Sequence, residues 1–272
     1  MKRIWALDPF SLFLAAGLVM ATLFVLAPIF FVILNSFNAA EYNVFPPQGF
    51  SLRWYNLVFN EPDFGKAFIN SMIVGVGSMS LSLIVGTSVA WTFVRYLYSG
   101  QSLIRSFIFA PITVPRIGLG MAVFLLYIRV GLYGGRFGLI LVHSLLSLPF
   151  VVSVMTAVLY SADPVLEDAA HDLGATKLQS FLKITLPQIS TGLIVSGLFA
   201  FIISFDELVT SIFLVRPENN TLPIKMFLYV QEFQNPTLAA LASTLIFGTI
   251  IIVIILYPTL KSKEARRLFS RR

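Results

Sequence analysis

Long apolar stretches, separated by short polar segments, follow one another along the whole chain. A transmembrane helix needs about 20 apolar residues to cross a bilayer, and six stretches of at least that length can be found. Their predicted bounds are roughly residues 10–35, 67–94, 103–130, 138–160, 189–215 and 238–260. The pattern therefore predicts an all-α membrane protein with six transmembrane helices and little chain left for a separate soluble domain.

The composition supports a lipid environment. Hydrophobic residues make up 57% of the chain, charged residues only 12%, and the mean hydropathy is +0.85. This balance leaves too little polar surface to coat a soluble globule. The first apolar run, after Lys2 and Arg3, is about 25 residues long, which exceeds the roughly 7 to 15 residues of a signal sequence. We expect it to remain as an uncleaved anchor.

Basic residues are distributed unequally between the two predicted sides of the membrane. The more basic side carries twelve and the other side six, counting residues at the span ends with the nearer side, and Arg116 alone falls well inside a span. The positive-inside rule then predicts that both termini lie in the cytoplasm. The same asymmetry explains the pI of about 9.7 without any nucleic-acid partner. The twelve residues are Lys2, Arg3, Arg95, Arg105, Lys177, Lys183, Lys261, Lys263, Arg266, Arg267, Arg271 and Arg272.

The connections 36–66 and 216–237 are predicted to face outward. In the first of them, breakers at Pro46, Pro47 and Gly49 precede Ser51, a candidate N-cap for the amphipathic run Leu52 to Phe59. We expect a short helix there on the outer surface. No other element is predicted in these two connections.

The cytoplasmic connection 161–188 carries signals for two short helices. Asp163 can cap a helix that begins at Pro164, and Gly174 is typical of a helix end. Thr176 and Gln179 have the spacing of a capping box, which predicts a second helix running toward Pro187. Such a unit is too short to span the membrane. From physical chemistry alone, it is either a docking surface for a cytoplasmic partner or an ordinary amphipathic connector.

The same connection resembles the signature loop of bacterial ATP-binding-cassette (ABC) importer permeases. That loop begins with Glu-Ala-Ala in the family, whereas Asp168 stands here in place of the glutamate, directly after Glu167. Other stretches are similar to the same permeases or to their spermidine/putrescine (polyamine) branch. The matching positions are Asp168, Ala169, Ala170, Gly174, Ile184, Leu186 and Pro187 in the loop, and elsewhere Ser51–Tyr55, Ser204–Glu207, Thr221–Pro223 and Pro236–Thr237.

The resemblance implies a type I ABC importer permease fold, with residues 1–272 as one permease domain in the bacterial inner membrane. It implies a second permease subunit, usually a different chain, two copies of an ATPase subunit and a periplasmic substrate-binding protein. The loop 161–188 would then contact the ATPase. The residues that the resemblance assigns to this coupling are Glu167, Asp168, Ala169, Ala170, Gly174, Leu186 and Pro187.

The chain itself offers no catalytic or cofactor motif. The only Gly-Lys pair, Gly65-Lys66, is followed by Ala67 rather than Ser or Thr, so we expect ATP and Mg²⁺ to be bound by the partner ATPase subunits. Cysteine is absent and histidine occurs only twice, which argues against a metal site. We therefore expect a chain that is not an enzyme, with no cofactor of its own.

Three charged residues fall inside predicted spans, at a cost of at least about 2.5 to 3.5 kcal/mol each. Arg116 lies about 20 Å into the third span and Asp206 about 25 Å into the fifth. Pro111 and Pro115 precede Arg116 and favour a position beside a water-filled pathway. Asp206 and Glu207 would point about 100° apart on a helix, so we expect only one of them, Asp206 by analogy with the polyamine branch, to face the pathway.

Two roles for these charges stay open. In the first, Asp206 with Glu207 attracts a substrate ammonium, Arg116 contacts an anionic group, and Tyr127 and Phe205 supply rings for the cation. In the second, Arg116 and Asp206 form a structural ion pair between helices. An arginine is not expected here in the polyamine branch, so a zwitterionic amino-acid or opine-like solute stands beside a polyamine as the predicted substrate.

A proton-coupled secondary carrier is the main alternative, because it could use Asp206, Glu207 and His143 within the membrane. His143 itself is more typical of a hydrogen-bonded interhelical residue. A carrier leaves the 168–187 signature unexplained. A membrane hydrolase is less favoured, since the run Gly86–Ala90 lacks the last glycine of the Gly-x-Ser-x-Gly motif.

Overall fold

The chain is mainly helical in the part that the computed structural model describes, which is residues 9–269, with side-chain surroundings for residues 10–255. Over these residues the only β-type pairing is one isolated bridge between Asn38 and Phe50. Four helices are long and apolar enough to cross a membrane, and the number rises to six if each of two bent helix pairs is one span. The all-α prediction is confirmed.

The described residues form two compact units, one of residues 9–62 with 228–269 and one of residues 63–227. The first unit contains α1 (Pro9–Ser36), α2 (Arg53–Asn60) and α12 (Thr237–Phe269), and α12 packs against both α1 and α2. The spans expected at 10–35 and 238–260 are therefore helical, as is the short run after Ser51. The Ser51 hydroxyl accepts a hydrogen bond from the backbone N–H of Arg53 at 3.2 Å.

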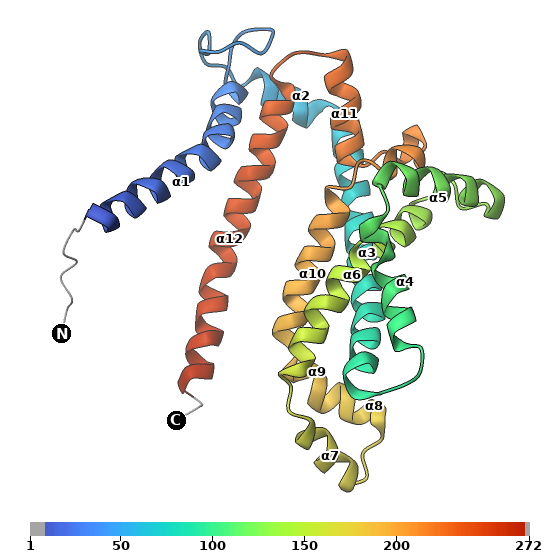
Figure 1. Cartoon of the computed structure of the whole chain (residues 1–272). Coiled ribbons are helices and arrows are strands. Elements are labelled where there is room, and N and C mark those ends of the chain that lie inside the picture. Colours follow the sequence, from blue (N-terminus) through green and yellow to red (C-terminus); the bar gives the residue numbers. More distant parts are fainter. Residues whose placement is uncertain (1–8, 270–272) are drawn as a thin grey trace. The chain divides into compact units, whose positions relative to one another are not determined.

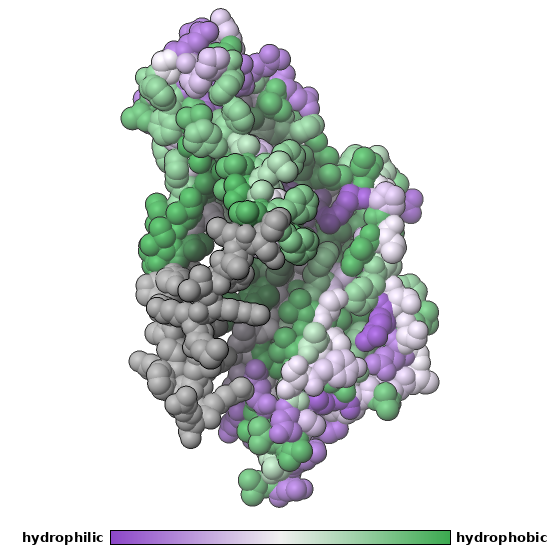
Figure 2. Space-filling model, turned by 60° about the vertical axis from the view of Figure 1, so that its left-hand side comes forward, coloured by the Kyte–Doolittle hydropathy of each residue, from purple (hydrophilic) through white to green (hydrophobic). Residues whose placement is uncertain are grey.

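The outer surfaces of these helices are strongly apolar, as expected in lipid. Phe13 is 73% exposed and Phe24 80% exposed along α1, and Figure 2 shows wide hydrophobic areas on the visible face of the protein. Lys2, Arg3, Arg271 and Arg272, which enter the prediction of cytoplasmic termini, lie outside the described residues. The orientation of the termini and the single permease domain stay predictions.

The second unit holds α3 to α10, the first half of α11 and the two candidate sites (Figure 1). Helices α6 and α10 pack against each other, and α4 packs against α6. Beyond α10, 3₁₀ turns at Ser211–Phe213 and Pro217–Asn219 lead to α11, which was not predicted and passes from this unit into the first. The elements are α3 (Pro62–Arg95), α4 (Gln101–Thr113), α5 (Arg116–Val130), α6 (Arg136–Tyr160), α7 (Pro164–Asp172), α8 (Lys177–Ser180), a π-helical turn (Phe181–Thr185), α9 (Leu186–Gln188), α10 (Ser190–Phe205) and α11 (Leu222–Glu232).

Small and hydroxyl-bearing residues allow α3 and α6 to approach closely. The hydroxyls of Ser82 and Ser147 lie 2.7 Å apart in a buried hydrogen bond. A Cβ atom on Gly86 would lie 2.7 Å from Cγ1 of Val151, so only glycine fits this contact. Such contacts replace the hydrophobic driving force that lipid does not supply between helices.

Two predicted spans are wrong as single continuous helices. The span 103–130 is broken between α4 and α5, which meet at 108°, because Pro115 lacks an N–H and its ring clashes with the preceding turn. The span 189–215 ends as a helix at Phe205, and residues 206–210 are irregular. There the Glu207 side chain accepts the backbone N–H of Thr210 at 2.9 Å, so a local side-chain bond takes the place of a helical one.

Candidate functional site

The first candidate site is residues 161–188, which we call the coupling segment. It lies at one end of α6 and α10 (Figure 1). The Asp163 carboxylate accepts the N–H of Val165 at 3.0 Å and caps α7, with Pro164 as the first helical residue. Helix α7 ends before Gly174, whose φ is +85° and whose N–H donates to His171 O at 2.9 Å. The start and end of the first predicted helix are confirmed.

The second half of the coupling segment also agrees with the prediction from the sequence. The N–H of Gln179 donates to the Thr176 hydroxyl at 3.3 Å, and Gln179 Oε1 accepts the N–H of Thr176 at 3.0 Å, which completes the capping box. The helix then passes through the π-helical turn to α9. The two ends of the segment are joined because the N–H of Asp163 donates to Gln188 Oε1 at 3.3 Å.

A buried ion pair fixes α7 to the end of α3. Arg95 Nη2 lies 2.8 Å from Glu167 Oε1, and the two side chains are only 15% and 9% exposed. Arg95 also donates from Nε to the same carboxylate oxygen at 3.1 Å and from Nη2 to Ala162 O at 3.3 Å. Glu167, which the resemblance assigned to the partner surface, therefore turns inward, and Asp168 is the exposed acid beside it.

The coupling segment exposes several large apolar side chains among its polar ones. Leu173 is 89% exposed, Leu178 66%, Val165 64% and Leu166 50%. Asp168, Ala169 and Pro187 are also exposed, whereas Ala170 and Leu186 are half-buried. Exposed apolar residues gathered on an ordered, capped helical unit are typical of a protein docking surface.

Gly174→Ala is expected to weaken coupling without a steric clash. A Cβ at this position would meet nothing within 4 Å, so the cost comes from the positive φ, about 1 to 2 kcal/mol for a residue other than glycine. Uptake by the assembled transporter should fall several-fold while the amount of chain in the membrane stays the same. Gly100→Ala, also at positive φ with open space but at the start of α4, is the matched control. Equal effects of the two substitutions would contradict a special role for the coupling segment.

The second candidate site is the membrane charge cluster, formed by Arg116, His143, Ser204, Glu207, Thr210 and Ser211. Arg116 Nη1 donates to Glu207 Oε2, and Glu207 is buried whereas the Arg116 side chain is 42% exposed. Glu207 Oε1 accepts from the Thr210 N–H at 2.9 Å and from the Thr210 hydroxyl at 3.0 Å. The ion pair between Arg116 and Asp206, one of the two roles left open by the sequence, is wrong, because Arg116 pairs with Glu207 instead.

His143 connects α6 to both sides of the break after α10. Its Nδ1 lies 2.8 Å from the Ser204 hydroxyl and its Nε2 lies 2.7 Å from the Ser211 hydroxyl, and the ring is fully buried. The Ser211 hydroxyl already donates its hydrogen to Glu207 O at 2.8 Å, so it must accept from Nε2–H of His143. This network holds the irregular backbone at 206–211 and agrees with the interhelical role expected for His143.

Asp206 lies beside this cluster but outside it. It follows the last residue of α10 and its side chain is exposed. No hydrogen bond or ion pair connects its carboxylate to any other residue in the described part of the chain. A carboxylate at a helix C-terminus is also disfavoured by the helix dipole, and no basic residue in the described part of the chain pairs with Asp206. Its role in the pathway stays a prediction.

The two predicted pathway rings have different surroundings. Tyr127 is buried, and its hydroxyl donates to Gly138 O at 3.0 Å, so it belongs to the core between α5 and α6 and the prediction of a pathway ring is wrong for it. Phe205 is partly exposed, stacks on Phe201 with ring centres 5.6 Å apart and meets Phe68 edge-on at 6.3 Å. Phe205 stays a candidate for contact with a cation.

Sequence reasoning missed several residues that hold the two sites. Arg95 entered only the count of basic residues, and Ser204, Thr210 and Ser211 were not singled out as site residues. The hydroxyl residues that flank Asp206 and Glu207 were the available signal, because such side chains bond locally to the backbone where a helix stops.

Helices long and apolar enough to cross a membrane, a capped helical segment at one end and a buried charge cluster at the helix breaks are consistent with a membrane transport component. The chain belongs to the family described as "binding-protein-dependent transport system inner membrane component", whose model matches residues 82–262. This range includes both candidate sites. The family comprises permease subunits of ABC importers and not enzymes, and nothing in the comparisons supports the secondary carrier.

Relatives of known function place the chain in the polyamine-type branch. It is 32% identical over 237 residues to the putrescine transport system permease protein PotI of Escherichia coli K12, covering 85% of this chain and 84% of PotI. It is 29% identical over 227 residues to the spermidine/putrescine permease PotC of the same strain, covering 84% of this chain and 86% of PotC. The fold matches a chain of a bacterial ABC transporter that imports alginate, with a TM-score of 0.72, 22% identity and coverage of 93% and 95%.

Proposed function

We propose that this chain forms half of the translocation pathway for a small cationic amine, delivered by a periplasmic binding protein across the bacterial inner membrane. A second permease subunit, usually a different chain, would form the other half, and two copies of an ATPase subunit would bind ATP and Mg²⁺. The observation that carries the choice of substrate is the unpaired, exposed carboxylate of Asp206 beside an arginine whose charge is already matched.

The pairing of Arg116 decides between the two substrate classes. From the sequence, Arg116 counts against a purely cationic solute and in favour of a zwitterionic amino-acid or opine-like compound. The ion pair with Glu207 neutralises the positive charge of Arg116 within the protein, so this charge does not need a substrate group. Asp206 then leaves the site with one net negative charge, which favours an ammonium over a carboxylate. The names of PotC and PotI, which refer to spermidine and putrescine, agree with a polyamine.

The coupling segment supports the proposed ATPase contact. Leu166 and Asp168 are exposed on α7, the helix that is fixed to α3 through Arg95 and Glu167. A force applied to α7 would therefore reach a membrane-spanning helix directly. A plain connector would need neither the buried ion pair nor the exposed apolar side chains.

Asp206→Asn is expected to reduce polyamine uptake by about 10- to 100-fold. This factor corresponds to the roughly 1.5 to 3 kcal/mol of a hydrogen bond to a charged group. Uptake of radiolabelled putrescine and spermidine would be measured in membrane vesicles that contain the chain with its partner subunits, and a zwitterionic amino acid would be the comparison substrate.

The control for this substitution is Glu218→Gln, which removes an exposed carboxylate outside the helix break. It should leave uptake within about twofold. Equal polyamine uptake by Asp206→Asn and the unaltered chain, at equal assembly, would exclude Asp206 from the pathway. Transport of the amino acid in preference to both polyamines would reject the cationic substrate.

A further inference from the structure

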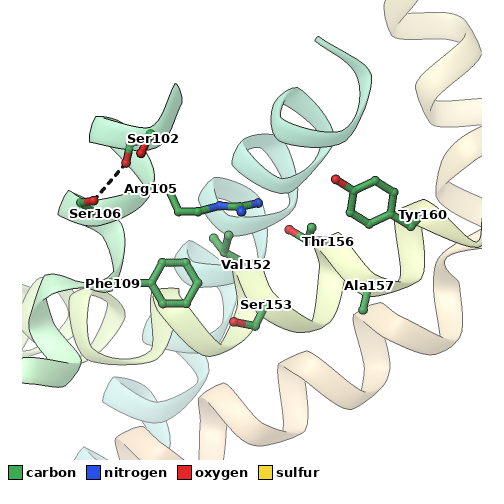
Figure 3. A pocket seen from close by; sticks show the side chains of 9 residues that line it. All are labelled: Ser102, Arg105, Ser106, Phe109, Val152, Ser153, Thr156, Ala157 and Tyr160. Atoms are coloured by element: carbon green, nitrogen blue, oxygen red, sulfur yellow. Dashed lines mark hydrogen bonds between the residues drawn. The ribbon is translucent and has the colours of Figure 1, made fainter. Parts of the chain in front are cut away.

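A cavity of about 590 Å³ lies between α4 and α6, away from both sites described above. Figure 3 shows the Arg105 side chain extending from α4 across the cavity toward α6. Five of the nine lining residues carry hydroxyl groups and none is acidic. The lining residues are Ser102, Arg105, Ser106, Phe109, Val152, Ser153, Thr156, Ala157 and Tyr160.

Two polar groups in this cavity lack a polar partner. Arg105 forms no ion pair within the described part of the chain, and its guanidinium lies over the ring of Phe93, 5.4 Å from the centre. The Thr156 hydroxyl is buried without a hydrogen-bond partner. A positive charge beside an unsatisfied hydroxyl fits an anionic group with several acceptor oxygens.

The backbone of α4 increases the positive potential. Helix α4 starts after Gly100, and Ser102 belongs to its first turn. The unbonded N–H groups of a helix N-terminus favour an anion. The charge and the helix end therefore both favour an anion, which also separates this cavity from the cation pathway proposed at Asp206, and the Thr156 hydroxyl is free to donate a hydrogen bond to it.

The position of the cavity indicates where the anion comes from. Tyr160 is the last residue of α6, at the same end as the coupling segment. This end faces the cytoplasm in the orientation of the proposed function, on which this step rests. Phe109, Val152 and Ala157 add an apolar wall beside the polar groups, a combination that suits a headgroup together with the start of its acyl chains. Basic pockets between transmembrane helices on this side of a membrane are typical lipid headgroup sites.

We propose that this cavity binds the phosphate of an anionic membrane phospholipid, with Arg105 as the charged contact and the Thr156 hydroxyl as a hydrogen-bond donor. The lipid would fill the space between α4 and α6. Because α4 continues through the break to α5, the bound lipid would support the helix pair that carries Arg116 of the membrane charge cluster.

Lipid retention by the purified, assembled transporter tests this proposal. The complex would be delipidated in detergent, incubated with phosphatidylglycerol or phosphatidylcholine, and analysed by native mass spectrometry for lipid that stays bound. Arg105→Gln should reduce retained phosphatidylglycerol at least fivefold, the factor that corresponds to about 1 kcal/mol per basic side chain. Thr156→Val should also reduce it, and Arg105→Lys should restore most of it.

Arg129→Gln is the matched control, because Arg129 is exposed near the other end of α5 and does not line the cavity. It should leave retention unchanged. Equal retention by Arg105→Gln and Arg129→Gln would overturn the proposal. Full displacement of the lipid by inorganic phosphate would assign the site to a free anion and overturn the lipid assignment. Since retention is measured without transport, a failure here is distinguishable from a failure of the proposed substrate.

Discussion

Glu167→Gln is expected to reduce uptake at least tenfold while the assembled transporter continues to hydrolyse ATP. The substitution leaves Arg95 only 15% exposed and without its carboxylate, and removing one member of a buried ion pair costs about 3 to 5 kcal/mol. Helix α7 would then lose its rigid connection to α3, although the docking surface itself would be intact. Uptake and ATP hydrolysis would be measured in the same vesicles.

Two further variants separate coupling from folding. Asp172→Asn removes another carboxylate from α7, one that is exposed and belongs to no recorded ion pair, so it should leave uptake nearly unchanged. The exchange Arg95→Glu with Glu167→Arg restores opposite charges and should recover part of the uptake lost in Glu167→Gln. Normal uptake by Glu167→Gln would show that the ion pair does not transmit the motion.

The capped helices of the coupling segment were predictable because their signals are local. Asp163, Pro164, Gly174 and Thr176 each act on backbone groups within a few residues. The bonds from Val165 to Asp163 and from Gln179 to Thr176 show this directly. Capping interactions of this kind can be predicted from a few consecutive residues.

The breaks in the third and fifth spans were not predictable from apolar composition. An irregular segment that is buried in protein has the same hydropathy as a helix, so residues 208–215 look like the rest of the fifth span. Proline alone does not locate the other break either, because Pro111 lies inside α4 whereas Pro115 stands at the start of α5. The difference depends on packing that the sequence pattern does not display.

The ion-pair partners of the charged side chains were also not predictable from the sequence. The expectation that Asp206 and Glu207 point about 100° apart assumes a helix, but α10 ends at Phe205. The turn that follows directs Glu207 into the protein, where Thr210 and Arg116 bind it. Similarly, Arg95 and Glu167 are 72 positions apart in the chain, and no sequence spacing connects them.

Glu207→Gln is expected to have a large effect within the membrane. Arg116 would lose its charged partner in a span, at a cost of at least about 2.5 to 3.5 kcal/mol. The unmatched positive charge would also lie near Asp206 and repel an ammonium substrate. Polyamine uptake should therefore fall at least tenfold. A substitution that changed packing without changing charge should have a smaller effect. Chain levels in the membrane, assembly with the partner subunits and uptake would be measured together.

The double variant Arg116→Gln with Glu207→Gln tells whether the ion pair is internal to the protein or part of the substrate site. Removing both charges restores neutrality, so uptake should recover well above that of Glu207→Gln, and the recovery measures the coupling between the two side chains. A double variant no better than the single one would mean that Arg116 or Glu207 contacts the solute itself. In that case the zwitterionic solute, with its carboxylate on Arg116, would replace the polyamine as the proposed substrate.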